Sequence, residues 1–143
     1  MIMTKKFYLA AFMSLFAALM LIGCATHHAP VSPPPSSLKE ISPISAYQFQ
    51  KDKKAVIVDV REENETSKGR VKDSVLLPLS LMKNDPVAFK AKVDELKKYN
   101  SVIVYCQSGR RAGIVGEELK KNGLDVYNMG GFDSWKNQKL PTE

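Results

Sequence analysis

The residues best suited to chemistry are a cysteine and two arginines that follow it within five positions. Cys106 lies between a β-branched apolar stretch, residues 101–105, and a stretch with apolar residues near helical spacing, residues 112–121. Backbone N–H groups at such a turn, the start of a helix and neighbouring cations all favour an ionised, nucleophilic thiol. We therefore predict a reactive thiolate in a strand–loop–helix turn. The turn, called here the Cys106 loop, consists of Cys106, Gln107, Ser108, Gly109, Arg110, Arg111 and Ala112.

The elements that must position this loop alternate between short apolar and amphipathic stretches. Strands are expected at residues 55–60, 75–77, 101–105 and 125–128. Helices are expected at residues 43–49, 86–98, 112–121 and 132–136, with a helical turn within residues 61–68. Candidate packing residues of the helix at 86–98 are Val87, Phe89, Val93 and Leu96, and the helix at 112–121 has apolar Ile114, Val115 and Leu119. The alternation predicts an α/β fold, a parallel β-sheet flanked by helices on both faces.

Ligands of parallel sheets bind beyond the carboxyl ends of the strands. Cys106 is predicted to end one strand, and Asp59 and Arg61 follow at the end of another. We therefore expect these three residues to lie close together in space, with Asp59 and Arg61 bracing the loop.

Four motifs, in order along residues 41–140, resemble those of the rhodanese-like sulfurtransferases. They are the Asp59-x-Arg61 turn after a strand, Gly69-Arg70-Val71, the Cys-x-x-x-x-Arg loop from Cys106 to Arg111, and the Gly-Gly-x-x-x-Trp element ending at Trp135. Arg70 stands where the family usually has histidine, so no role is carried over to it. The resemblance implies a rhodanese-like fold.

The resemblance also implies a mechanism. Cys106 attacks the sulfane sulfur of a donor such as thiosulfate, forms a persulfide, and passes the sulfur to a thiophilic acceptor, cyanide or a thiol. Residues 107–112 hold the persulfide, Arg111 closes the loop by bonding to backbone or to a carboxylate, and Arg110 contacts an anionic donor. We expect small sulfur-containing anions and thiols as partners, no metal or organic cofactor, and a monomer.

Three other functions compete with sulfur transfer. Cysteine phosphatases and arsenate reductases use a similar loop with one more residue, which is wide enough for a tetrahedral oxyanion. Only four residues separate Cys106 from Arg111, and this spacing argues against both enzymes. The third alternative is a non-catalytic module that binds or senses sulfur, and the retained cysteine argues against it.

Residues 1–23 have the features of a lipoprotein signal peptide. Lys5 and Lys6 precede an apolar run at residues 7–22, and the segment ending Gly23-Cys24 resembles the bacterial lipoprotein box. Cys24 is then the acylated residue. Ala25 after it resembles lipoproteins of the Gram-negative outer membrane, so we expect an exported protein, lipid-anchored on the periplasmic side. An uncleaved membrane anchor and ordinary cleavage after Ala25 are the alternatives.

The remaining chain divides into a Pro/Ser-rich tether, residues 24–37, and the rhodanese-like domain, residues 38–143. His27 and His28 lie in the tether, where a metal pair would have no fixed geometry. With Cys24 acylated, Cys106 is the only free thiol in an oxidising compartment, so no internal disulfide can form. The formal charge of +6 comes without a basic stripe interleaved with aromatic residues, which excludes nucleic acid as an expected partner.

Overall fold

The computed structural model describes residues 37–143, and its centre is a five-stranded parallel sheet with the spatial order β1-β5-β4-β2-β3. The strands are β1 (Lys39–Glu40), β2 (Ala55–Asp59), β3 (Val75–Leu76), β4 (Ser101–Cys106) and β5 (Val126–Gly131). The helices are α2 (Pro43–Lys51), α3 (Glu63–Thr66), α4 (Leu79–Asn84), α5 (Pro86–Leu96), α6 (Arg110–Lys121) and α7 (Phe132–Asn137). The strand order places β4 in the middle of the sheet.

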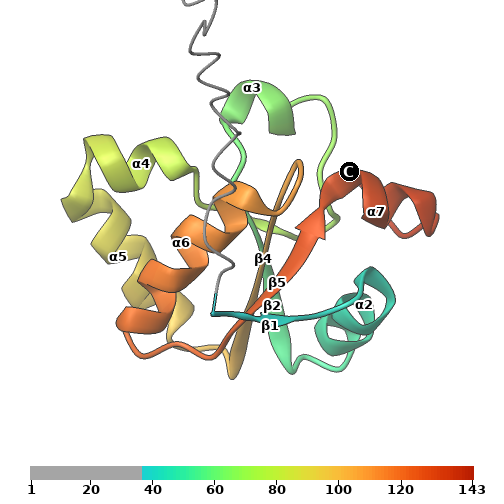
Figure 1. The fold of residues 1–143 in the computed structure, drawn as a ribbon, viewed down its shortest axis with the longest axis horizontal. Coiled ribbons are helices and arrows are strands. Elements are labelled where there is room, and N and C mark those ends of the chain that lie inside the picture. The colour runs from blue at the N-terminus through green and yellow to red at the C-terminus, as the bar shows by residue number, and fades with distance from the viewer. Residues whose placement is uncertain (1–36) are drawn as a thin grey trace, which may run out of the picture. The chain divides into compact units, whose positions relative to one another are not determined.

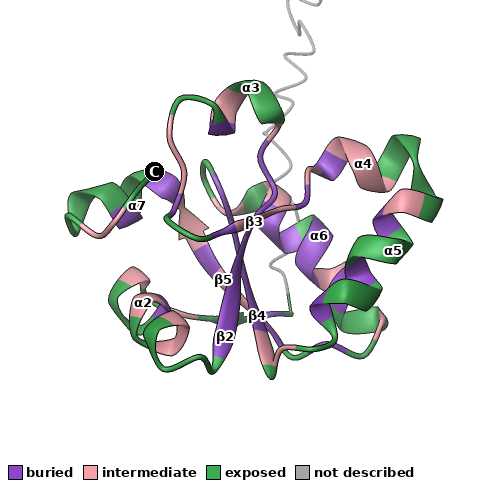
Figure 2. Ribbon diagram, turned by 180° about the vertical axis from the view of Figure 1, so that it is seen from behind, coloured by how far each residue is buried: buried purple, intermediate pink, exposed green. Residues whose placement is uncertain are grey.

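Helices cover both faces of the sheet, with α4, α5 and α6 on one side and α2 and α7 on the other (Figure 1). Side chains of β4 alternate between the two faces. Val102, Val104 and Cys106 belong to the core beneath α5 and α6, whereas Ile103 and Tyr105 belong to the core beneath α2 and α7. The two central strands β2 and β4 are consequently buried along almost their whole length (Figure 2).

Local signals in the sequence set where the helices begin. The Ser42 hydroxyl accepts a hydrogen bond from the Ser45 amide at 3.2 Å, and Pro43 occupies the first turn of α2. Asp85 does the same for α5, accepting from the Ala88 amide at 2.9 Å ahead of Pro86. Both helices begin at the residue expected from the sequence, 43 for α2 and 86 for α5.

Each expected helix and strand is present, with ends that differ by a few residues. The packing role expected of Val87 is wrong, because this side chain is 81% exposed while Phe89, Val93 and Leu96 are buried. At about 100° per residue, Val87 lies roughly 200° around the helix from Phe89 and so faces outward. Ile114 of α6 is 45% exposed for the same reason, since the buried stripe of that helix follows Ala112, Val115 and Leu119.

Two elements were not expected, β1 and α4. The strand β1 has only two residues, both exposed, and is defined by its pairing with Tyr127 and Asn128 of β5. Helix α4 follows directly after Pro78 and is six residues long. Neither is long enough to show a clear hydrophobic period.

Two general observations concern the described residues, 37–143. None of the helices there has the length and apolar character needed to cross a bilayer. Within the same range, no three His, Cys, Asp or Glu side chains gather closely enough to hold a metal ion. The predicted signal peptide, Cys24 and most of the tether lie outside the described residues.

Candidate active site

The carboxyl ends of the central strands converge at Cys106, the last residue of β4. Cys106 pairs in register with Gly131 at the end of β5, and its neighbour Tyr105 pairs with Asp59 at the end of β2. Helix α6 begins at Arg110, so three residues turn the chain from β4 into the helix. The structure therefore brings Cys106, Asp59 and the start of α6 to one edge of the sheet.

The Cys106 sulfur lies inside the turn. The Gly109 amide donates a hydrogen bond to Sγ at 3.1 Å, and the residue is only 1% exposed. Gly109 has φ +91°, a left-handed conformation that favours glycine over residues with a Cβ atom. The amide donor and the N-terminal end of a twelve-residue helix both favour negative charge at the sulfur.

Residues at the end of β5 support the turn from behind. Asn128 Nδ2 donates to the Gly109 carbonyl at 3.2 Å, and Asn128 Oδ1 accepts from the Gly130 amide at 2.9 Å. A register shift opposite Val104 and Tyr105 of β4 marks the irregularity of β5 at this point. A Cβ atom at Gly131 would lie 2.5 Å from the Gln107 carbonyl oxygen, so the close approach of β5 to the turn requires glycine there.

An ion pair ties the Cys106 loop to α3. Arg111 Nη1 and Nη2 donate to the two carboxylate oxygens of Glu65 at 2.5 and 2.7 Å. The hydrogen bonds from Arg111 lower the pKa of the Glu65 carboxyl to about 2. The pKa of Arg111 is raised, mainly by the Glu65 hydrogen bonds and further by the charge of Cys106. Arg111 is thus bonded to a carboxylate, the second of the two partners expected for it.

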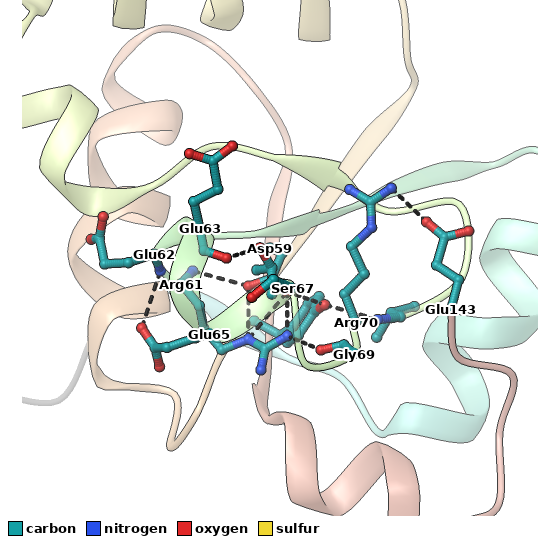
Figure 3. A network of polar contacts seen from close by, with 12 residues as sticks. Asp59, Arg61, Glu62, Glu63, Glu65, Ser67, Gly69, Arg70 and Glu143 are labelled. Atoms are coloured by element: carbon teal, nitrogen blue, oxygen red, sulfur yellow. Dashed lines mark hydrogen bonds and ion pairs between the residues drawn. The ribbon is translucent and has the colours of Figure 1, made fainter.

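Asp59 and Arg61 form a buried ion pair (Figure 3). Arg61 donates from Nε to Asp59 Oδ1 at 3.0 Å, from Nη2 to Oδ2 at 2.7 Å, and from Nη2 to the Gly69 carbonyl at 2.9 Å. Tyr105 also donates its hydroxyl to Asp59 and accepts from the Val71 amide at 3.0 Å. Burial, together with the Asp59 charge, raises the pKa of Tyr105. The network joins β2, β4 and the segment around Gly69.

Arg70 takes part in a separate contact with the C-terminal segment. Its Nη2 lies 2.6 Å from Glu143 Oε1 (Figure 3), and the backbones of the two residues exchange hydrogen bonds of 2.8 and 3.0 Å. An isolated antiparallel bridge between Val71 and Thr142 adjoins them. The arginine at the family's usual histidine position is therefore engaged by the end of the described chain.

Two cavities flank the turn. The first, called here the Arg61 cavity, has a volume of about 240 Å³ and is lined by Arg61, Glu65, Lys68, Gly69, Gln107, Phe132 and Lys136. The second, of about 300 Å³, is lined by Glu40, Ile41, Ser108, Gly109, Asn128, Met129 and Gly130. Residues of the Cys106 loop line both, but exposed Arg110 lines neither.

The wall of the Arg61 cavity is held by contacts around Phe132. The Arg61 guanidinium carbon lies 4.3 Å from the ring centroid and the Lys136 ammonium 5.1 Å from it. Gln107 Nε2 donates to Asp133 Oδ2 at 2.8 Å, which connects the Cys106 loop to α7. The Cys106 loop is thus attached to α7 as well as to α3.

Several residues of the site were not singled out from the sequence. They include Glu65, Lys68, Asn128 and Phe132. Glu65 stands 46 residues from Arg111, and Asn128 stands 19 residues from Gly109, so no local spacing pairs them. The one available signal was the Glu62-x-x-Glu65 spacing of a capping box, which the structure contains at the start of α3.

Comparison with known proteins assigns the family. A model of the rhodanese-like domain matches residues 42–138. The chain belongs to the rhodanese-like family. The thiosulfate sulfurtransferase GlpE of Coxiella burnetii is 29% identical to it over 100 residues, which cover 68% of this chain and 87% of that protein. The uncharacterized protein YqhL of Bacillus subtilis is 35% identical over 85 residues, and the match spans 58% of this chain and 62% of YqhL.

Solved structures of the rhodanese-like fold superpose on the described domain. A rhodanese-related protein from Thermoplasma volcanium matches with a TM-score of 0.60 at 24% identity, over 73% of this chain and 97% of that chain. A Rhodopseudomonas palustris protein, described as a possible tyrosine phosphatase, matches with a TM-score of 0.63 at 24% identity, over 75% and 86%. Identities this low show the fold alone. The predicted rhodanese-like α/β fold is confirmed.

The Gly131 contact yields a first prediction. Gly131→Ala should displace the Gln107 carbonyl and, with it, the Gly109 amide that donates to Cys106 Sγ. We expect alkylation of Cys106 by iodoacetamide at pH 7 to slow by about tenfold, since losing the charge-stabilising hydrogen bond disfavours the thiolate by roughly 1.5 kcal/mol. Gly123→Ala is the control, because Gly123 has φ +88° but no atom within 4 Å of an added Cβ. Equal alkylation rates in wild type and Gly131→Ala would contradict this account of the turn.

The Glu65–Arg111 pair yields a second prediction. The pKa of Glu65 falls from 4.5 to about 2 on folding, so the pair's stabilisation is complete above pH 4.5 and is lost as the pH falls toward 2. Glu65→Gln should lower the free energy of unfolding by about 1.5–3 kcal/mol at pH 6. The difference from wild type should shrink steadily between pH 4.5 and pH 2, as measured by urea denaturation.

A neighbouring carboxylate gives the control for this measurement. Glu63 lies on the same short helix but is exposed and has no ion pair within residues 37–143. Glu63→Gln should change the unfolding free energy by less than about 0.5 kcal/mol at either pH. A pH-independent gap between wild type and Glu65→Gln would show that the ion pair is not its source.

Proposed function

We propose that the protein is a sulfurtransferase that moves a sulfane sulfur from a donor such as thiosulfate to cyanide or a thiol through a Cys106 persulfide. The observation that carries the proposal is the position of the Cys106 sulfur, which lies inside a turn of three residues and accepts a hydrogen bond from the Gly109 amide. The naming of GlpE as a thiosulfate sulfurtransferase supports the same activity.

The reaction is a double displacement. The Cys106 thiolate attacks the outer sulfur of thiosulfate, a new S–S bond forms, and the old S–S bond breaks with its electron pair leaving on sulfite. A nucleophilic acceptor then attacks the outer sulfur of the persulfide and regenerates the Cys106 thiolate. Cyanide becomes thiocyanate in this second step, and no external oxidant or reductant is consumed.

The surrounding residues have distinct tasks in this scheme. The backbone N–H groups of the Cys106 loop, with Gly109 first among them, hold the negative charge of thiolate and persulfide. Arg111 closes the loop through Glu65, and Gln107 connects it to Asp133. Asp59 and Arg61 keep the ends of β2 and β4 together beneath it.

The size of the turn supports sulfur transfer over phosphoryl transfer. A loop with four residues between Cys106 and Arg111 encloses one sulfur atom more readily than a tetrahedral phosphate or arsenate. The likeness to the possible tyrosine phosphatase of R. palustris concerns the fold and not the loop chemistry. A non-catalytic sulfur-binding module remains the alternative of another class, and persulfide turnover distinguishes it.

We also propose that the chain is exported and anchored through an acylated Cys24 on the periplasmic side of a Gram-negative outer membrane. The basic start, the apolar run at 7–22 and the Leu-Ile-Gly-Cys sequence ending at Cys24 support this location. Cys106 would then act in an oxidising compartment, on donors and acceptors outside the cytoplasm.

Intact mass spectrometry of the purified full-length chain tests the enzyme proposal. Incubation with thiosulfate should add the mass of one sulfur atom and release sulfite, and subsequent cyanide should remove the sulfur as thiocyanate. Cys106→Ser should abolish both steps, because a serine hydroxyl does not accept sulfane sulfur. Loading without discharge to cyanide or to any thiol would favour the sulfur-binding module. Hydrolysis of p-nitrophenyl phosphate without sulfur loading would favour the phosphatase.

Metabolic labelling with radioactive palmitate in a Gram-negative host tests the anchor. Wild type should carry label and sediment with the outer membrane, because two or more acyl chains hold a protein there stably. Cys24→Ala should carry no label. An unlabelled, soluble wild type would overturn the anchor and leave the sulfurtransferase proposal standing.

A further inference from the structure

The charges around the Arg61 cavity are nearly all neutralised by partners within the site. Arg61 is paired with Asp59 at 2.7 Å, and Arg111 with Glu65 at 2.5 Å. Lys136, on α7, is paired with Asp133 at 2.8 Å. The field of a cation that is paired in this way is largely cancelled by its carboxylate, so the cation attracts a further anion only weakly.

Lys68 is the exception among the cations that line the cavity. It follows α3 by two residues, its side chain is exposed, and it makes neither an ion pair nor a side-chain hydrogen bond within residues 37–143. Of the three cations that line the cavity, Arg61 and Lys136 each have a carboxylate partner, so Lys68 is the lining cation without an ion pair among residues 37–143.

The position of Arg110 sharpens the contrast. Arg110 was expected from the sequence to contact an anionic donor, yet it is exposed on the first turn of α6 and lines neither cavity beside the Cys106 loop. Lys68 lines the same cavity as Gln107, the residue directly after the nucleophile. Lys68 is therefore better placed than Arg110 to contact a donor.

We propose that Lys68 determines donor specificity, by attracting sulfane donors whose leaving group is a small anion into the Arg61 cavity. This inference rests on the proposed sulfur transfer. The ammonium attracts the sulfonate end of thiosulfate while the outer sulfur is directed toward Cys106. Because an exposed charge binds ground state and transition state alike, Lys68 acts on KM and on the salt dependence, and leaves kcat nearly unchanged.

The experiment measures Cys106 persulfide formation in the full-length chain with two donors whose leaving groups differ in charge. Thiosulfate leaves as the sulfite anion, whereas the leaving end of cysteamine persulfide carries an ammonium group. Cysteamine persulfide reacts by the same displacement. The Cys106 thiolate forms a new S–S bond with the outer sulfur, the donor's S–S bond breaks, and cysteamine leaves as a thiolate. The variants are Lys68→Gln, Lys68→Arg and Arg110→Gln.

Lys98→Gln is the matched control, because it removes the same charge from an exposed lysine outside the site. Lys98 lies just before β4 begins at Ser101, whereas Cys106 ends that strand. A six-residue strand separates the two positions by about 20 Å, beyond the screening length at physiological salt. Lys98→Gln should load from both donors like wild type.

Lys68→Gln should raise the KM for thiosulfate by about two- to fivefold, the range expected for one exposed charge, with kcat within twofold. Its kcat/KM for thiosulfate should also depend less on salt. Its loading from cysteamine persulfide should equal or exceed that of wild type. The Lys68→Arg variant keeps the charge and should behave like wild type with both donors. The inference is overturned if Lys68→Gln slows both donors equally, or if Arg110→Gln alone raises the KM for thiosulfate. Failure of the wild type to load from either donor would instead remove the proposed function, and this inference with it.

Discussion

The site depends on how little chain is available to turn from β4 into α6. Three residues, 107–109, reverse the direction of the backbone, and this forces the Cys106 sulfur inside the turn and beneath the first amides of the helix. The left-handed conformation of Gly109 is part of the same geometry, because it aims an N–H at the sulfur. The polar contacts around the turn then serve to keep this short connection in one shape.

The turn is held from three directions by contacts of different strength. Glu65 bonds Arg111 from α3, Asn128 bonds Gly109 from β5, and Asp133 bonds Gln107 from α7. The buried Asp59–Arg61 pair lies below, where desolvation of two charges offsets much of their attraction. The pair instead holds neighbouring segments in place, because Asp59 also accepts a hydrogen bond from Tyr105 of β4 and Arg61 donates one to the Gly69 carbonyl.

The sequence was a good guide wherever the determining contact is local. Ser42 and Asp85 cap helices through amides three residues further on, and each precedes a proline. The starts of α2 and α5 can therefore be predicted from the local sequence alone. The β-branched run that leads into Cys106 likewise predicts a buried strand. Val87 shows the limit, because an apolar residue in the first turn of a helix has no periodic neighbour before it to fix its face. β1 exists only through its pairing with β5, and Glu65 gains its role only when folding brings it to Arg111.

The close approach of β5 to the turn makes two parts of the chain depend on each other's shape. The Gln107 carbonyl oxygen would lie 2.5 Å from a Cβ atom at residue 131, and Gly130 Cα would lie 3.1 Å from a Cβ atom at residue 109. Space behind the turn is therefore already filled. A relative with a longer loop, suited to a larger oxyanion, would need a compensating retreat of the β5 end as well as the inserted residue. The space inside the turn is thus set jointly by two segments, and a change in the length of one requires a change in the other.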